Sequence, residues 1–412
     1  MESNEGSHTH LRWIVPHAIT ILIGFGVILY GFSVYVTDKA AGGEFSKSVL
    51  SVAFAGSVFT GGLLALPVGR YADKHGVRTM VGAGSTVAAL GLAAFSVSQE
   101  PWQVIAAWWL IIGPASAAIY YEPAYIAIDQ WLLPDRRARA IAILTVIGGL
   151  SGIIFIPLAG WLVSLMEWRA AVLVLAALLF VAGGSTALFA LPGAPDRTDH
   201  VNAQTVRDFA LKSLLKDRRF LLYTLAMTIV FLATQGVIIH RVALFSEAGF
   251  SLQQVTTWAA LASAISLPGR WIGPMLAARF GPIRVQTTIV LIVTTGVLFM
   301  LDGTSQWQMI AHFALFGLAF GGIFPLRAMV MSDWFSGPNY GRIMGAQWGI
   351  TVLIGASGSA IVGISRDISG GYQASIILII AMLAVAIVAM GASPRFAPAE
   401  QDAKPGAKRT GA

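Results

Sequence analysis

Residues 69–78 read GRYADKHGVR, a short charged stretch that separates two long apolar runs. The runs at 47–69 and 79–98 are each long enough to cross the roughly 30 Å hydrocarbon core of a bilayer as a helix. A weaker copy of the charged stretch, LAARFGPIR, occupies residues 276–284, about 204 residues further along. A connection of this kind that occurs twice predicts a duplicated bundle of transmembrane helices.

The composition of all 412 residues is that of a polytopic membrane protein. Charged residues make up 11% of the chain and hydrophobic residues 56%, whereas a soluble domain carries about 25% charged residues. The net charge of +7 is spread over short loops and both ends without interleaved aromatic residues, which argues against nucleic acid as a partner. The absence of cysteine excludes disulfides and thiolate metal sites, and we expect no cofactor.

Apolar runs of transmembrane length recur twelve times, in two sets of six. We place them at 13–36, 47–69, 79–98, 102–127, 140–164, 169–191, 220–245, 253–277, 284–302, 307–331, 342–365 and 371–392. The predicted fold is an all-α membrane protein with a six-helix bundle in each half, at 1–191 and 220–393. Residues 192–219 are predicted to form a cytoplasmic linker and residues 394–412 a disordered tail.

The positions of lysine and arginine predict the orientation in the membrane. With the N-terminus in the cytoplasm, twenty of the 27 basic residues lie on the cytoplasmic side, four lie outside and three lie within spans. Cytoplasmic loops are the ones enriched in basic residues. We therefore expect a multi-pass protein of the cell (inner) membrane, surrounded by lipid, with both termini in the cytoplasm.

Two further pairs of segments support the duplication. MEWRAAVLV at 166–174 corresponds to GGYQASIIL at 370–378, and Arg139 opens the fifth span as Arg342 opens the eleventh. Transporters built from such repeats place the substrate between the halves, near the middle of the membrane. The chain has no Gly-x-x-x-x-Gly-Lys loop to hold phosphates, so we do not expect ATP to power transport.

The stretch at 69–78 resembles the loop signature of the major facilitator superfamily, G-x-L-A-D-R-x-G-R-R. The glycines, the acid and the basic residues fall at the matching offsets. The resemblance implies the major facilitator fold, with twelve transmembrane helices in two pseudo-symmetric six-helix bundles. It also implies that Asp73 helps to hold the outward-facing state as part of a cytoplasmic gate. The second copy has Ala278 where the acid would stand, so this gate is expected to be asymmetric.

Segments YGFSVYV at 30–36 and SLPGRWIGP at 266–274 resemble the monocarboxylate and oxalate/formate carriers within that superfamily. Those carriers hold the substrate carboxylate with an arginine in span eight, and Arg270 stands at the matching position. The chain differs at Ser266, where the animal carriers have an aspartate, and it lacks the lysines of spans one and eleven. The resemblance implies a small organic anion as the substrate.

Arg270 is also a candidate from its position alone. A charge at bilayer depth costs about 2.5–3.5 kcal/mol on insertion scales, so its presence indicates a function. Its planar guanidinium fits a carboxylate. We predict that Arg270 binds the substrate with help from Tyr30, Tyr121 and Tyr125, and the alternative is that its side chain extends to the membrane surface.

Glu122 is the only acid that we place within a span, and Arg327 occupies the equivalent place in span ten, 205 residues later. Spans four and ten face the cavity in the superfamily, so we expect the two residues to pair across the cytoplasmic half. Three roles are open for this pair: a permanent structural bridge, a gate that opens during the cycle, or part of proton coupling.

Other ionisable residues lie near the ends of spans. His240 and Arg241, near the outer end of span seven, either draw anions into the outer vestibule or anchor the helix at the interface. His17 and His312 are expected to be interfacial histidines with satisfied hydrogen bonds.

These patterns predict a secondary transporter rather than an enzyme. The first hypothesis is a monomeric carrier of a small organic anion, coupled to protons or to counter-exchange. The alternative is a proton-driven efflux pump for drugs or metabolites, in which Glu122 binds the proton or the cation and the arginines are structural. The aromatic content permits this alternative, as do Gly148, Gly149 and Gly152 in span five, although ordinary helix packing explains these glycines.

Overall fold

The described part of the protein is helical throughout. The computed structural model describes residues 12–37, 40–193, 214–302 and 304–396, and within these ranges helices joined by short connections account for the fold. Ten helical segments within these ranges are long and apolar enough to cross a membrane. Two more, α14 (Leu252–Phe280) and α15 (Pro282–Leu298), occupy the predicted positions of spans eight and nine. The predicted twelve-helix fold is therefore confirmed.

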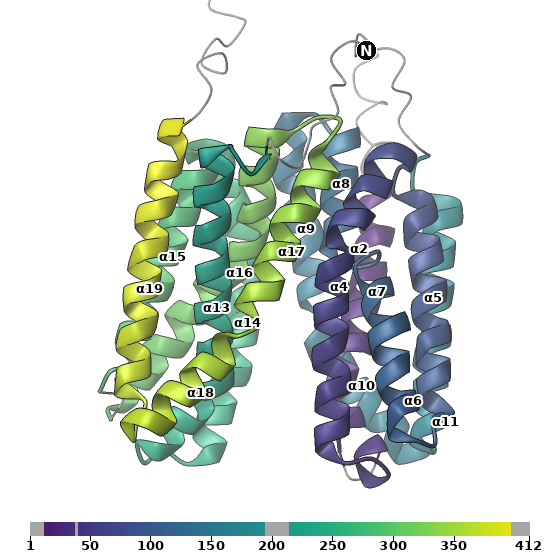
Figure 1. The fold of residues 1–412 in the computed structure, drawn as a ribbon, viewed down its shortest axis with the longest axis horizontal. Helices are drawn as coiled ribbons and strands as arrows, with labels where there is room; N and C mark the ends of the chain where they lie inside the picture. Colours follow the sequence, from purple (N-terminus) through teal and green to yellow (C-terminus); the bar gives the residue numbers. More distant parts are fainter. Residues whose placement is uncertain (1–11, 38–39, 194–213, 303, 397–412) are drawn as a thin grey trace, which may run out of the picture.

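Figure 1 shows the helices of the two halves as two bundles. The N-terminal bundle contains α2 (Ile14–Gly24), η1 (Phe25–Tyr30), α3 (Gly31–Tyr35), η2 (Ala41–Gly43), α4 (Lys47–His75), α5 (Arg78–Ser96), α6 (Pro101–Ala106), η3 (Ala107–Ile112), α7 (Gly113–Ser116), α8 (Tyr121–Trp131), α9 (Pro134–Gly149), α10 (Ser151–Leu165), α11 (Trp168–Ser185) and η4 (Thr186–Ala190). The C-terminal bundle contains α13 (Arg218–Glu247), α14, α15, α16 (Gln306–Phe335), α17 (Tyr340–Gly355), α18 (Gly358–Ser369), α19 (Gln373–Ala392) and η5 (Ser393–Phe396).

The two bundles pack together at one end and diverge at the other (Figure 1). We call the end at which α2 begins and α19 finishes the terminal end. One cluster of buried hydrophobic residues joins both bundles, and its N-terminal members, such as Ile14, Ile126 and Ile141, lie toward the terminal end. A second cluster, which includes Val27 and Trp108, belongs to the N-terminal bundle alone. The shared hydrophobic core thus holds the molecule closed at its terminal end.

The domain limits stay a prediction, because most of the predicted linker at 192–219 and of the tail at 394–412 lies outside the described residues. The first and last described helices meet the terminal end together (Figure 1), as an even number of spans requires. Which side of the membrane that end faces also stays a prediction, since it depends on the distribution of basic residues.

The expected loop at 69–78 is wrong in its extent. Helix α4 continues to His75, and it ends because Gly76 has a φ of 73°, a left-handed conformation that favours glycine. Asp73 therefore lies in the last turn of a helix and is buried. Its fixed place on a helix lets it reach the C-terminal bundle.

Several spans that the sequence predicts as single helices are interrupted. Span one contains the π-helical segment η1, and span four turns between Ser116 and Tyr121 before α8 begins. Spans five and eleven break near Leu150 and Ala356. Breaks in transmembrane helices are tolerated where the freed backbone groups are buried in protein or line a cavity. The breaks in spans one and four line a cavity.

Candidate functional site

A cavity of about 330 Å³ lies between the two bundles. Its volume falls at the lower end of the range typical of small-molecule sites. The lining residues come from η1, α4, the α7–α8 connection, α8 and α9 on one side, and from α13, α14, α16 and α17 on the other. Both halves of the molecule therefore contribute to one central site, as expected for a transporter built from repeats.

Irregular helix geometry brings side chains of spans one and four to this cavity. Phe25 and Tyr30 begin and end the π-helical segment η1, and both line the cavity. Tyr120 has an extended backbone at the break in span four, and Tyr121 begins α8 directly after it. The rings of Phe25 and Tyr120 stack with centroids 4.0 Å apart. π-helical segments of this kind are frequent at functional sites.

Arg270 lines the cavity from the middle of α14, which continues unbroken through Pro268 and Pro274. Its Nη1 donates to the Tyr121 hydroxyl and to the Thr145 carbonyl, each over 3.4 Å, and its Nε has no hydrogen-bond partner among the described residues. These bonds are long. No carboxylate in the described ranges lies within ion-pair distance of its guanidinium. The cation is thus weakly satisfied and open to a stronger acceptor.

The glycines of span five make room for three of the four side chains predicted to bind substrate. A Cβ on Gly149 would lie 2.7 Å from Nε of Arg270, and one on Gly152 would lie 2.8 Å from Cε1 of Tyr30. A Cβ on Gly148 would collide with the hydroxyl of Tyr121. These glycines allow close packing, as expected. The side chains that they pack against belong to the site around the cavity.

Glu122 and Arg327 form a buried ion pair between α8 and α16. Nη1 of Arg327 also donates to Oε1 of Gln347 over 2.5 Å, and its guanidinium lies 4.7 Å from the ring centroid of Trp348. The second oxygen of Glu122 accepts no hydrogen bond within the described part of the chain. The pair joins the two bundles beside the cavity, and its role in transport stays a prediction.

The three predicted tyrosines all line the cavity. Tyr121 and Tyr125 stack with centroids 5.8 Å apart, and the buried hydroxyl of Tyr125 has no partner among the described contacts. Tyr30 lies against Gly152, as described above. The structure therefore brings together Arg270, the tyrosines and the Glu122–Arg327 pair around one space.

His240 and Arg241 lie away from this space. His240 contacts the Ser359 carbonyl and the Tyr372 hydroxyl at 2.9 and 3.2 Å. Arg241 is buried over the rings of Phe313 and Phe316, inside the C-terminal bundle. These contacts give no support to a role in drawing anions to the site.

The two histidines expected at interfaces are fully buried. Nδ1 of His312 lies 2.9 Å from the Gly296 carbonyl, but its Nε2 has no partner in the described structure. Neither ring nitrogen of His17 has one. The expectation of satisfied interfacial histidines is therefore wrong, because the helices pack around both rings and exclude the membrane surface.

At the terminal end, Asp73 connects α4 to the beginning of α17. Its carboxylate accepts hydrogen bonds from the backbone N–H groups of Gly341 and Arg342, at 2.8 and 2.7 Å. The first N–H groups of a helix have no partner within the helix and favour a negative charge. The contact suits the gating role that the resemblance implies, which stays a prediction.

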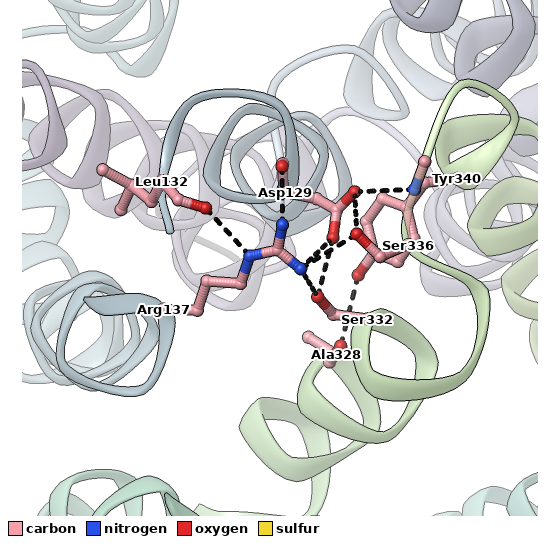
Figure 2. Close-up of polar contacts among 8 residues, drawn as sticks. Asp129, Leu132, Arg137, Ala328, Ser332, Ser336 and Tyr340 are labelled. Atoms are coloured by element: carbon pink, nitrogen blue, oxygen red, sulfur yellow. Dashed lines mark hydrogen bonds and ion pairs between the residues drawn. The ribbon is translucent and has the colours of Figure 1, made fainter. Parts of the chain in front are cut away.

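A second connection at this end was missed by the sequence analysis (Figure 2). Asp129, buried near the end of α8, forms an ion pair of 2.6 Å with Arg137 of α9. The hydroxyls of Ser332 on α16 and of Ser336, the residue after this helix, donate to the two carboxylate oxygens over 2.7 and 3.1 Å. Helix α8 extends to Trp131, past the predicted end of span four at 127, so Asp129 lies on the same helix as Glu122.

The sequence offered no reliable signal for this connection. Asp129 and Arg137 flank the short link between spans four and five, but polar residues at helix ends are usually solvated. Nη1 of Arg137 donates to both serine hydroxyls, over 2.6 and 3.0 Å, and Nη2 donates to the Asp129 carbonyl. The network therefore crosses from the N-terminal to the C-terminal bundle.

Comparison with known proteins identifies the family of this chain. The family model described as the Major Facilitator Superfamily matches residues 17–305. The chain belongs to the Major Facilitator Superfamily. It is therefore a membrane transporter and not an enzyme, as predicted.

Individual relatives agree with this assignment. The MFS-type transporter pynF of Aspergillus niger is 27% identical over 343 residues, which cover 80% of this chain and 74% of the relative. Monocarboxylate transporter 13 of Bos taurus is 25% identical over 367 residues, which cover 87% of this chain and 82% of the relative. The second similarity confirms the resemblance to monocarboxylate carriers seen in the sequence.

A solved structure of the transporter FucP in the outward conformation superposes with a TM-score of 0.74 at 14% identity, covering 95% of this chain and 99% of that one. The human organic anion transporter MFSD10 gives a TM-score of 0.70 at 15% identity, covering 93% and 99%. At this level of identity the likeness shows the shared fold.

Proposed function

We propose that this transporter moves a small organic anion of the monocarboxylate type across the cell membrane. The observation that carries the proposal is the state of Arg270, a permanently charged guanidinium in the wall of the cavity without a described carboxylate partner. Arg327, in contrast, already has Glu122 as its counter-ion. An anionic ligand would supply the missing counter-charge.

The position of Arg270 also links substrate binding to movement of the bundles. It belongs to α14 of the C-terminal bundle, but its hydrogen-bond partners lie on α8 and α9 of the N-terminal bundle. A substrate carboxylate at Arg270 would replace these long bonds with short, charge-assisted ones. The contact between α9 and α14 would then change whenever the site is filled or emptied.

The transport cycle requires both ends of the cavity to open in turn. In the described state the bundles meet at the terminal end, where Asp73 and Asp129 hold α17 and α16. With the predicted orientation this end is cytoplasmic, and the state faces outward. Opening of the terminal end would break both carboxylate contacts, and closure of the opposite end would occlude the substrate.

Coupling to protons or to counter-exchange is part of the proposal. The Glu122 oxygen that has no partner among the described residues is buried beside the cavity, where a proton or a substrate donor would satisfy it. In this scheme the Glu122–Arg327 pair loosens during the cycle. If the Glu122–Arg327 pair instead stays intact throughout the cycle, transport would be driven by counter-exchange and not by protons.

The test is uptake of radiolabelled carboxylates into proteoliposomes that contain the purified protein. Arg270→Gln should reduce uptake by at least about a hundredfold, because one charge-assisted bidentate contact is lost. Arg270→Lys should retain part of the activity, since it keeps the charge and loses the planar fork. Arg279→Gln is the matched control, because it removes a charge from the exposed end of the same helix.

Unchanged carboxylate uptake in Arg270→Gln would sink the anion assignment. Transport of lipophilic cations that is blocked by Glu122→Gln and independent of Arg270 would instead support the alternative of drug efflux. The aromatic lining of the cavity is compatible with such cations, but the ion pair leaves Glu122 without a free charge to offer them.

A further inference from the structure

The chemistry of the cavity wall restricts the substrate further, on the assumption that the proposed function is correct. The wall offers one charge without a counter-ion among the described residues, that of Arg270. The hydroxyls of Ser57 and Ser116 donate to carbonyls of their own helices, at Phe54 and Gly113. A ligand with a second negative charge would leave that charge without a cationic partner in a low-dielectric site.

The remaining wall is mainly aromatic. On the C-terminal side Phe231, Phe324 and Trp348 pack edge to face, with centroids 5.6 to 6.2 Å apart and interplanar angles of 64 to 89°. Each ring fixes the orientation of the others, so this part of the wall is rigid before any ligand arrives. Phe25 and Tyr120, stacked on each other, line the N-terminal side. Rings on both sides favour a flat ligand that presents faces and edges to them.

The size of the cavity argues against a short aliphatic acid. A volume of about 330 Å³ would hold roughly ten water molecules at about 30 Å³ each. An acid of three carbons would displace only roughly a third of them. The remaining water would face aromatic rings that offer few hydrogen bonds, an unfavourable arrangement that a larger apolar group removes.

We infer that the substrate is a monoanion whose carboxylate is attached to an aromatic or similarly planar ring system. The carboxylate binds at Arg270 and the ring packs between the aromatic side chains of the two bundles. A one-ring or two-ring acid matches the cavity in charge, shape and volume, whereas lactate or pyruvate matches it in charge alone.

The experiment compares benzoate and indole-3-acetate with lactate and pyruvate, and with the uncharged benzamide and indole-3-acetamide. The purified full-length protein is tested for thermal stabilisation by each compound and for uptake of the labelled acids in proteoliposomes. The aromatic acids should bind with at least about tenfold higher affinity than the aliphatic ones. Neither amide should stabilise the protein at the same concentration.

Two variants separate the ring from the charge. Trp348→Leu should lower the affinity for aromatic acids about tenfold and leave that for lactate unchanged. Phe320→Leu, also in the wall but away from the guanidinium of Arg327, tests the same point if the first variant is unstable. Arg270→Gln should abolish binding of both kinds of acid, whereas Arg279→Gln should not.

The outcomes distinguish this inference from the proposed function. Lactate or pyruvate bound as tightly as benzoate, and dependent on Arg270, would overturn the inference and leave the anion carrier intact. Binding of the amides as tight as that of their acids would overturn both. Both the inference and the proposed function would also be overturned if Arg270→Gln had no effect on the binding of any acid. Tighter binding of the aromatic acids that depends on Arg270 and Trp348 would support both.

Discussion

At the scale of single residues, the buried pair of Glu122 and Arg327 concentrates the electrostatic cost of the site. Both side chains are almost completely shielded from solvent. A buried pair contributes little compared with two apolar residues, but removal of one partner leaves an uncompensated charge. The arginine also keeps its contacts with Gln347 and Trp348 when the carboxylate is lost.

We therefore expect Glu122→Gln to destabilise the protein by about 3 kcal/mol or more. Arg327→Gln should have a similar effect, and the double variant should be more stable than either single one, because no unpaired charge remains. Thermal and chemical unfolding of the purified variants would give the coupling energy of this cycle.

Asp135→Asn provides the control, since this acid is exposed at the start of α9. Strictly additive effects of the two substitutions would show that the ion pair is not an energetic unit. Full stability with lost proton dependence of transport would instead identify Glu122 as a coupling residue.

The pairing of these two residues could be anticipated from the sequence, because the internal repeat places them at equivalent positions. Arg270 could also be found from the sequence, because it is a rare charge within an apolar run. Asp129 could not, because its burial depends on Ser332 and Ser336 of a helix that is distant in sequence. A polar residue near a helix end carries no local sign of such partners.

At the scale of helices, span five shows how the absence of a side chain shapes the site. Its glycines place the backbone of α9 and α10 against the residues that we assign to substrate binding. Glycine in a transmembrane helix permits close approach of a neighbour. Here the neighbours are functional side chains as well as other helices.

We expect Gly148→Ala and Gly152→Ala to impair transport by pushing the rings of Tyr121 and Tyr30 out of place. Overpacking of this kind costs about 1–3 kcal/mol, so an equal loss in binding would lower the apparent affinity by about 5-fold to 150-fold. Gly160→Ala is the control, because its Cβ would meet nothing within 4 Å. Uptake kinetics would separate the three variants, and equal activity in all of them would contradict this role.

The twelve spans could be predicted because long apolar runs and basic loops are strong local signals. The breaks in spans one, four, five and eleven could not. The π-helical segment Phe25–Tyr30 has the composition of an ordinary apolar helix. Its geometry depends on packing, including Phe155 against the backbone of Gly26, and this information lies elsewhere in the chain.

At the scale of the whole molecule, two carboxylates of the N-terminal bundle hold the terminal end closed. Asp73 engages the beginning of α17, and Asp129 engages the end of α16. The sequence does not reveal which end is closed, because a transporter exchanges between states that differ by a few kcal/mol. The sequence can only indicate candidate residues that would stabilise one of these states.

We expect Asp129→Asn to shift this equilibrium toward opening of the terminal end. If the closed state loses about 1.4 kcal/mol of stabilisation, the equilibrium constant changes roughly tenfold. The chain has no native cysteine, so paired spin labels can be placed without background. Labels at Leu133 and Phe280 report on the terminal end, and labels at Leu165 and Ile368 on the opposite end, all exposed positions. The first distance should lengthen and the second should shorten.

The same labels on Asp135→Asn should show the distances of the unmodified protein. Identical distance distributions in Asp129→Asn would show that the network around Arg137 does not set the balance between states. The contact of Asp73 with the beginning of α17 would then remain as a described polar link at this end.

The lack of a carboxylate partner for Arg270 among the described residues has an electrical consequence. Under the proposed cycle the empty carrier bears a net positive charge in its cavity, whereas the carrier loaded with a monoanion is neutral. A membrane voltage acts on moving charge with about 2.3 kcal/mol per elementary charge and 100 mV. Voltage would therefore govern the return of the empty carrier and leave one-for-one exchange unaffected.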